Sequence, residues 1–277
     1  MLNHDDLSQG GKLQDITPLR KVPAFVTDSG LNLFESFVIL SYLEDRFGEG
    51  RGRGNNDSSA SAATAAIPPP PRLVLDTPDE RAFVQLLVRQ HDIYISSPNC
   101  TQPHFSHTQG CMYLDPIPTK YTPARRTMPD PNVRASKLKE IYERLCWLEE
   151  SIGGCVSGAS TSGTSTRMAP YMAGERITHA DITWYPTCIF MEVLLPFCFD
   201  WSPIFYNDKD STVGGNGGGI VCFPRLTKWF QHCSKNEHFA SVRKDIYDVL
   251  TRQKEDGRFD GVRDVVQKHP ELKWKYI

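Results

Sequence analysis

Three polar, low-complexity stretches divide the chain and limit which residues are available to build a folded core. They are rich in Gly, Ser and Ala, and they comprise Arg51 to Arg72, Gly153 to Arg167 and Asn207 to Gly219. Segments of this composition do not bury enough apolar surface to offset the conformational entropy that ordering them would cost. We therefore expect flexible loops at these places, and folded structure in the segments between them.

Helical periodicity dominates the segments between the loops. A capping box with a proline at the first helical position marks one helix start at Thr77, and another helix is expected to open at Asp130. Further helices are expected from Thr178, over Leu226 to Cys233 and over Phe239 to Leu250. Apolar spacings of three and four predict buried sides made by Val38, Ile39, Tyr42, Leu43 and Phe47, by Phe83, Leu86, Leu87 and Ile93, and by Leu138, Ile141, Leu145, Leu148 and Ile152.

Strand patterns are confined to the N-terminal part of the chain. The best candidates are Val22 to Thr27 and Leu31 to Phe34, which are joined by Asp28-Ser29-Gly30. This turn chemistry is typical of a β-hairpin. The order is therefore strand, turn, strand and helix, followed by an all-helical remainder.

Composition narrows the function classes. The 277-residue chain has a formal net charge of -2, which gives no electrostatic reason to expect nucleic acid or an anionic membrane as a partner. No apolar run approaches the length that spans a bilayer. The polar, acidic start MLNHDDLSQGGKLQD has neither a secretory-signal nor a transit-peptide pattern. With eight cysteines and no C-x-x-C pair, reduced thiols in the cytoplasm are the simplest expectation.

The segment Lys21 to Gly48, KVPAFVTDSGLNLFESFVILSYLEDRFG, is the most informative about function. Val22-Pro23, two short strands and then Glu35-Ser36 at a helix start resemble the second half of the thioredoxin-like domain of glutathione transferases. The resemblance implies a cis proline whose neighbouring backbone pairs with the cysteine of glutathione, and a Glu-Ser pair that holds the γ-glutamyl end. The glutathione-binding residues that it implies are Lys21, Val22, Pro23, Glu35 and Ser36.

The residues themselves are compatible with such a site. Ser36 lies at a helix N-terminus, where free N–H groups and the helix dipole favour a carboxylate, and Glu35 can meet the γ-glutamyl ammonium. Each residue also has a structural explanation, because Pro23 suits a strand entry, Ser36 an N-cap and Glu35 a first helical turn. The joint pattern at this spacing favours the glutathione site.

A second capping box is formed by Thr178 and Asp181 at the start of ERITHADITWYP. It resembles the box that opens a buried core helix in the C-terminal domain of glutathione transferases, where its role is structural. We therefore expect Thr178 and Asp181 to be structural, with a general-base role for Asp181 as the alternative.

A third group of residues has metal-ligand character. Cys100, His104, His107 and Cys111 form C-x3-H-x2-H-x3-C, which does not match the spacing of a standard zinc finger. We expect a polar loop and no metal. Nearby, Arg89-x-His91-Asp92 is expected to be a salt-bridged helix end, with a substrate role as the alternative.

The catalytic residue stays unassigned. Only 22 residues precede Pro23, whereas a complete βαβ unit takes roughly 30 or more. In glutathione transferases that unit precedes the proline and carries the catalytic Tyr, Ser or Cys. Ser8 lies in a polar stretch and is not expected to be catalytic, so we interpret the sequence as an N-terminally truncated version of such a protein.

The predicted fold is mostly α, with a remnant of a thioredoxin-like α/β domain followed by an all-helical domain. Its expected parts are a partial glutathione-binding domain over 1–50, a linker over 51–76, a helical domain over 77–250 and a tail over 251–277. Trp274 and Tyr276 suggest that the tail packs on something.

The resemblance implies conjugation of glutathione to small electrophiles, or glutathione-dependent reduction. It further implies detoxification in the cytoplasm, glutathione as co-substrate without a cofactor, and a homodimer formed partly by the Phe83 to Tyr94 helix. The missing catalytic segment leaves a non-catalytic protein-interaction module as the main alternative. A metal-binding protein that uses the Cys100 to Cys111 loop is a third.

Overall fold

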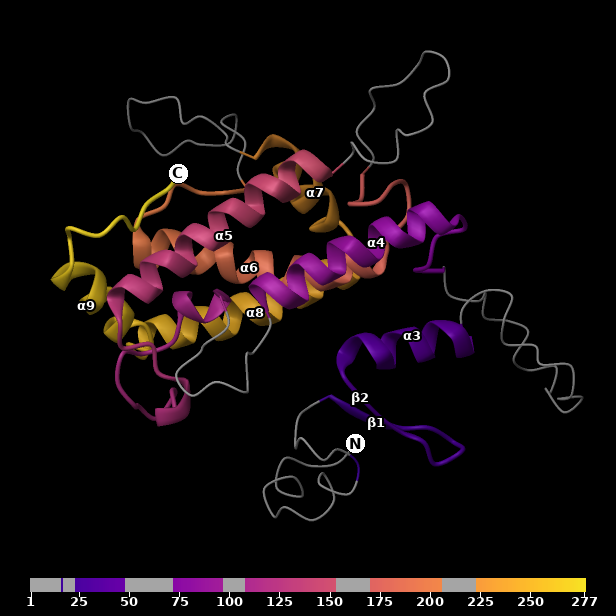
Figure 1. Ribbon diagram of the computed structural model, residues 1–277, viewed down its shortest axis with the longest axis horizontal. Coiled ribbons are helices and arrows are strands. Elements are labelled where there is room, and N and C mark those ends of the chain that lie inside the picture. Colours follow the sequence, from indigo (N-terminus) through magenta and orange to yellow (C-terminus); the bar gives the residue numbers. More distant parts are fainter. Residues whose placement is uncertain (1–15, 17–22, 48–71, 97–107, 153–169, 206–222) are drawn as a thin grey trace, which may run out of the picture. The chain divides into compact units, whose positions relative to one another are not determined.

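The computed structural model describes residue 16 and residues 23–47, 72–96, 108–152, 170–205 and 223–277. The chain divides into an N-terminal unit, Met1–Val74, and a helical unit, Leu75–Ile277 (Figure 1). Most of the three low-complexity stretches, expected as flexible loops, lie outside the described residues.

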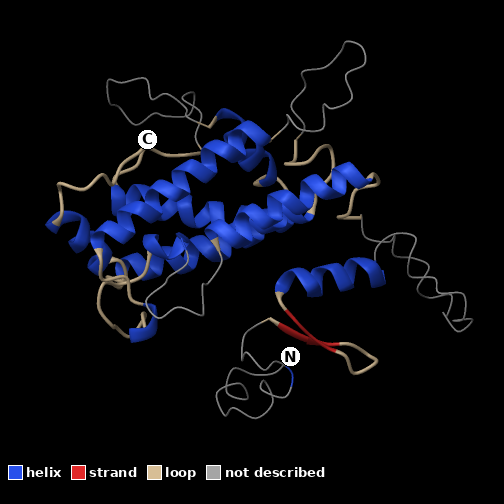
Figure 2. Cartoon of the chain, in the orientation of Figure 1, coloured by secondary structure: helices blue, strands red, loops and turns tan. Residues whose placement is uncertain are grey.

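The described part of the N-terminal unit is a hairpin followed by a helix. Strands β1 (Ala24–Val26) and β2 (Asn32–Phe34) are antiparallel, with Ala24 paired to Phe34 and Val26 to Asn32. Gly30 has φ +83°, a conformation that glycine adopts without strain, and this permits the turn. The predicted hairpin is confirmed, although its strands are shorter than expected (Figure 2).

Helix α3 (Ser36–Phe47) follows the hairpin, but its predicted buried side is only partly correct. Ile39 is buried, whereas Val38 is 45% exposed and Phe47 is 57% exposed. The hairpin has only two strands, so it covers a narrow strip of the helix. Within that strip the rings of Phe25 and Tyr42 lie 5.8 Å apart.

The described parts of the helical unit contain helices and no strands (Figure 2). The α-helices are α4 (Pro78–Gln90), α5 (Pro131–Ser151), α6 (His179–Phe199), α7 (Pro224–Cys233), α8 (Glu237–Glu255) and α9 (Asp260–Lys268). Three short helices accompany them, η2 (His91–Ile95), η3 (Thr108–Met112) and η4 (Ala124–Arg126). Helix α6 forms the centre of the core, because it contacts α4, α7, α8 and α9 (Figure 1).

The start of α4 is confirmed, but its predicted buried side is partly wrong. Thr77 and Glu80 form the capping box. The buried side chains of the helix are Phe83, Val84, Leu87 and Val88, whereas Leu86 is 46% exposed and Ile93 is 56% exposed. Leu86 and Ile93 are seven residues apart and therefore share the exposed face, whereas Leu87, His91 and Ile95 follow one another at spacings of four along the buried face, which continues into the π-helix η2.

Helix α5 matches the prediction. Asp130 caps it by accepting a hydrogen bond of 2.8 Å from the backbone N–H of Asn132. The predicted core residues Leu138, Ile141, Leu145, Leu148 and Ile152 are all fully buried.

The last residues belong to the helical unit and do not form a separate tail, contrary to the boundary expected at 251. Helix α8 runs to Glu255, and α9 follows it. The indole N–H of Trp201 donates to the backbone oxygen of Trp274 at 2.6 Å, and Tyr276 stacks on Tyr142 with ring centroids 5.4 Å apart. The two aromatic residues of this segment therefore do pack, as their presence suggested.

Helix α6 differs from the expectation that no apolar run approaches the length that spans a bilayer. By length and composition it is the one helix among the described residues that is apolar enough to cross a bilayer. Of the 18-residue window that meets this test, 61% is buried inside the protein. A helix surrounded by other helices is apolar on all sides, so its place in the core accounts for this composition.

Candidate functional site

The hairpin brings three of the five predicted glutathione-binding residues to one end of β1 and β2. Pro23 directly precedes β1, and Glu35 directly follows β2. Ala24 pairs with Phe34, so continuing the register by one step places Pro23 opposite Glu35, beside Ser36. All three residues are exposed. Lys21 and Val22 lie outside the described residues.

Glu35 has a strained backbone. Its φ is +74°, in the left-handed region that glycine favours and glutamate rarely adopts. Such a conformation costs a non-glycine residue about 1–2 kcal/mol. Strained residues cluster at ligand-binding positions, where the conformation aims a side chain that a relaxed backbone would direct elsewhere.

Glu35 and Ser36 define the start of α3. The backbone oxygen of Glu35 accepts the first helical hydrogen bond, from the N–H of Ile39 at 3.1 Å. Glu35 is therefore the N-cap and Ser36 the first helical residue, which differs from the N-cap role considered for Ser36. The helix dipole favours a carboxylate beside Ser36, while the Glu35 carboxylate offers a counter-charge to an ammonium.

Asp181 and Thr178 form a buried cap at the start of α6. One carboxylate oxygen of Asp181 accepts hydrogen bonds of 2.8 Å from the backbone N–H and the hydroxyl of Thr178. The other oxygen accepts from the backbone N–H of Met172 at 2.9 Å and from the indole N–H of Trp229 at 2.8 Å. Burial raises the pKa of Asp181, and these hydrogen bonds oppose the rise. With its oxygens occupied in this way, Asp181 has the environment of a structural residue.

His91 is likewise engaged in structure. Its ring nitrogens lie 3.0 Å from the Asp92 carboxylate and 2.8 Å from the Thr187 hydroxyl, and the ring is 5.2 Å from that of Trp184. His91 is buried. The contact of His91 with Asp92 lies at the helix end where Arg89-x-His91-Asp92 was expected to form a salt bridge.

The predicted metal-ligand group lies mostly outside the described residues, which include only Cys111 of its four members. Cys111 is fully buried in η3, and burial raises the pKa of its thiol to about 12. In the part of the chain that the structure describes, no cluster of His, Cys, Asp or Glu has the arrangement of a metal site.

The burial of the cysteines predicts their reactivity. Cys111, Cys188, Cys198 and Cys233 are buried with raised thiol pKa values, about 12 for Cys198, whereas Cys146 is half-buried. A pKa near 12 lowers the thiolate fraction at pH 8 about 1,000-fold relative to an ordinary thiol, and the thiolate is the nucleophile. In peptide mapping after iodoacetamide treatment of the folded chain, we expect Cys146 to be alkylated before these four. Rapid alkylation of any of the four in a folded sample would contradict this packing.

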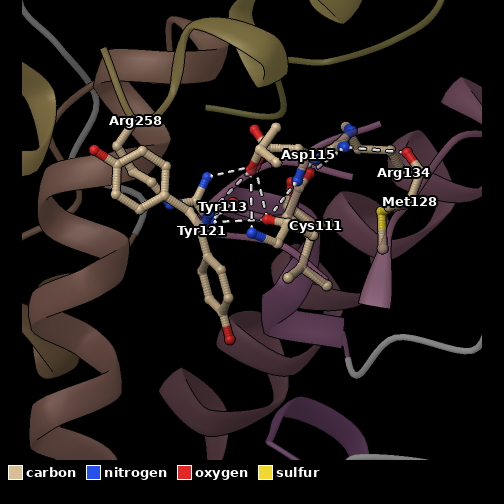
Figure 3. A network of polar contacts seen from close by, with 10 residues as sticks. Cys111, Tyr113, Asp115, Tyr121, Met128, Arg134 and Arg258 are labelled. Atoms are coloured by element: carbon tan, nitrogen blue, oxygen red, sulfur yellow. Dashed lines mark hydrogen bonds and ion pairs between the residues drawn. The ribbon is translucent and has the colours of Figure 1, made fainter. Parts of the chain in front are cut away.

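Two buried arginines were missed by sequence reasoning (Figure 3). Arg134 donates to the backbone oxygens of Cys111, Leu114 and Met128. Arg258 pairs with Asp115 at 2.9 Å, and both side chains are buried. Neither arginine belongs to a motif, so no sequence signal distinguishes them from surface arginines.

The comparisons with known proteins agree with the geometry of the hairpin and α3. Residues 4–45 match the glutathione S-transferase N-terminal domain. This segment is therefore similar to the N-terminal domain of the glutathione transferases. The match begins before Lys21, where the segment that carries the resemblance starts. No curated protein is significantly similar to the chain.

Solved glutathione transferases share the fold. The chain is similar to glutathione transferase URE2P5 from Phanerochaete chrysosporium, with 14% identity over 91% of this chain and 84% of that one and a TM-score of 0.50. It is also similar to glutathione transferase Omega 3C from Trametes versicolor, with 16% identity over 89% of this chain and 76% of that one and a TM-score of 0.49. At this identity the likeness to URE2P5 establishes the fold, and with it the predicted thioredoxin-like remnant followed by a helical domain.

Proposed function

We propose that this glutathione transferase relative binds glutathione through Pro23, Glu35 and Ser36, together with the backbone of Lys21 and Val22. The observation that carries the proposal is the register of the hairpin, which aligns Pro23 with the strained Glu35 at the N-terminus of α3. In this pose the α-carboxylate of the γ-glutamyl group lies at the N-terminus of α3 beside Ser36, and its ammonium meets Glu35.

The activity that we propose is that of glutathione transferases, in which bound glutathione is conjugated to a small electrophile or serves as a reductant. Either reaction needs a donor that lowers the pKa of the glutathione thiol, because the thiolate is the nucleophile. That residue stays unassigned. We propose a cytoplasmic role in detoxification, with glutathione as co-substrate.

The test is retention of the full chain on immobilised glutathione, with elution by free glutathione. Glu35→Gln keeps the shape of the side chain and removes its charge, so we expect retention to fall about tenfold or more. Glu35→Gly also removes the carboxylate, but it relieves the positive φ and should leave the N-terminal unit at least as stable, with slower amide exchange. Asp45→Asn is the matched control, because Asp45 is exposed near the other end of α3.

Loss of retention in both Glu35 variants, with none in Asp45→Asn, would support the site. A folded chain that is not retained would contradict it and favour the non-catalytic interaction module.

The exposed Leu86, Ile93 and Tyr94 would then be the first surface to examine. The same residues are the proposed contribution of α4 and η2 to a homodimer, and a monomeric mass by light scattering would argue against that dimer.

A further inference from the structure

A carboxylate in the last turn of α3 binds the backbone of the segment that leads into α4. Both oxygens of Glu44 lie 3.2 Å from the backbone nitrogen of Leu73, which donates its N–H to this carboxylate. The Nε of Arg72 lies 3.9 Å from the same carboxylate. The Glu44 side chain is only 8% exposed, so water competes little for these contacts. The helix dipole disfavours a carboxylate in the last turn, and the contacts with Leu73 and Arg72 offset this cost.

The chain therefore leaves α3 and returns to it. Phe47 ends the helix one turn after Glu44, and Leu73 is bound at Glu44. The Cα atoms of Phe47 and Arg72 then lie within about 15 Å of each other, a distance that about five extended residues span. Residues 48–71, which lie outside the described residues, are several times as many. Their number is thus far more than is needed to join the two ends.

The helical unit holds the chain from Leu75 onwards. The Leu75 side chain is buried. The Arg81 guanidinium donates to the backbone oxygen of Leu75 at 3.3 Å and to that of Asp76 at 2.6 Å. The boundary between the two units falls after Val74. Val74 is therefore the residue that separates the attachment of Leu73 to α3 from the attachment of Leu75 to the helical unit.

We propose that Glu44 anchors Leu73 to α3 and thereby confines the connection between the two units to Val74, so that residues 48–71 are a loop of the N-terminal unit. Without this anchor the connection would extend over 48–74, and a flexible chain of that length has a mean end-to-end distance of about 30 Å. With the anchor, the connection has the two rotatable backbone dihedrals of a single residue. Glu44 thus sets how freely the two units move relative to each other. The inference does not depend on glutathione binding, because none of these residues belongs to that proposed site.

Amide hydrogen exchange in the full chain tests the anchor. The Leu73 N–H should be protected in the parent chain, and Glu44→Ala should accelerate its exchange about tenfold or more. Glu44→Gln keeps an oxygen that accepts from Leu73 and should accelerate the exchange less. Asp45→Ala removes the same charge from the neighbouring exposed residue of α3, and should leave the Leu73 rate unchanged. An unprotected Leu73 in the parent chain, or an unchanged rate in both Glu44 variants, would overturn the proposal.

Shortening the loop tests where its ends lie. Six Gly and Ser residues in place of 48–71 make the loop about fourfold shorter, which should keep or slow the exchange of Leu73, by up to about eightfold, because a shorter loop costs less entropy to close. The hairpin amides should keep the protection that they have in the parent chain. Faster exchange of Leu73 in the shortened chain would show that residues 48–71 span a longer distance, and would overturn the assignment.

A matched pair of insertions locates the connection. Six Gly and Ser residues inserted after Val74 should shorten the rotational correlation time of the hairpin amides, measured by nuclear magnetic resonance relaxation, because a flexible linker there lets the small unit tumble by itself. The same six residues inserted within 48–71 should leave this correlation time unchanged. Equal results for the two insertions, whether both shorten the correlation time or neither does, would overturn the assignment of the connection to Val74.

Discussion

Replacing Asp181 by alanine is expected to lower the free energy of unfolding of the helical unit by about 4 kcal/mol or more. Asp181 is fully buried, and its carboxylate accepts hydrogen bonds from the backbone N–H groups of Met172 and Thr178 and from the indole N–H of Trp229. Alanine would leave these three donors without their acceptor, and each unpaired buried donor costs about 1–3 kcal/mol. The loss is a large fraction of the stability of a typical domain.

The measurement is urea unfolding followed by tryptophan fluorescence. All five tryptophans, Trp147, Trp184, Trp201, Trp229 and Trp274, belong to the helical unit, so the signal reports that unit alone. Asp181→Asn should lose roughly half as much stability, because its amide oxygen still accepts from two donors while its amine group faces the Thr178 N–H. Asp248→Ala is the control, since Asp248 pairs with Lys244 in an exposed salt bridge that is worth less than about 1 kcal/mol. A fully folded, equally stable Asp181→Ala chain would show that the cap does not hold α6.

The features that the sequence predicted correctly are those with local causes. The caps at Thr77, Asp130 and Thr178 are set by side chains within three residues of the helix start, and the hairpin by its turn residues. The buried side of α4 was partly wrong because apolar residues occur on two faces, and the prediction joined Leu86 and Ile93 of the exposed face to Phe83 and Leu87 of the buried one. Local chemistry is thus readable from one sequence, whereas the choice between two apolar faces depends on which face the other helices cover.

The proposed site residues divide in the same way. Pro23, Glu35 and Ser36 were predicted from a family pattern that places them at fixed spacing, but the positive φ of Glu35 was not foreseen, since glutamate does not favour it. The pair of Asp115 and Arg258 is separated by 143 residues, so only the tertiary fold brings it together. Whether an arginine is buried depends on packing, which composition and periodicity do not specify.

Replacing Arg134 by alanine is expected to cost about 4 kcal/mol of unfolding free energy, as large an effect as that of Asp181. Arg134 is fully buried on α5, and it donates to the backbone oxygens of Cys111, Leu114 and Met128 at 2.5, 2.6 and 3.2 Å. Burial lowers the pKa of this arginine, because it removes water from the charged guanidinium. Through these hydrogen bonds the Arg134 side chain holds the segment from Cys111 to Met128 against α5.

Arg134→Lys tests whether the positive charge alone stabilises the protein, or whether the three hydrogen bonds are needed. Lysine keeps the positive charge but does not reproduce the planar fork that reaches three carbonyls, so about 2 kcal/mol should be lost. Lys139→Ala, on an exposed position of the same helix, is the control and should change stability by less than about 0.5 kcal/mol.

Amide hydrogen exchange distinguishes whether Arg134 positions the segment from Cys111 to Met128 or stabilises the whole core. Amide hydrogen exchange in the Arg134 variants should accelerate first at Leu114 and Met128, whose N–H groups bond within the tied segment. Uniform acceleration across α5 and α6 would mean that Arg134 stabilises the core without positioning this segment.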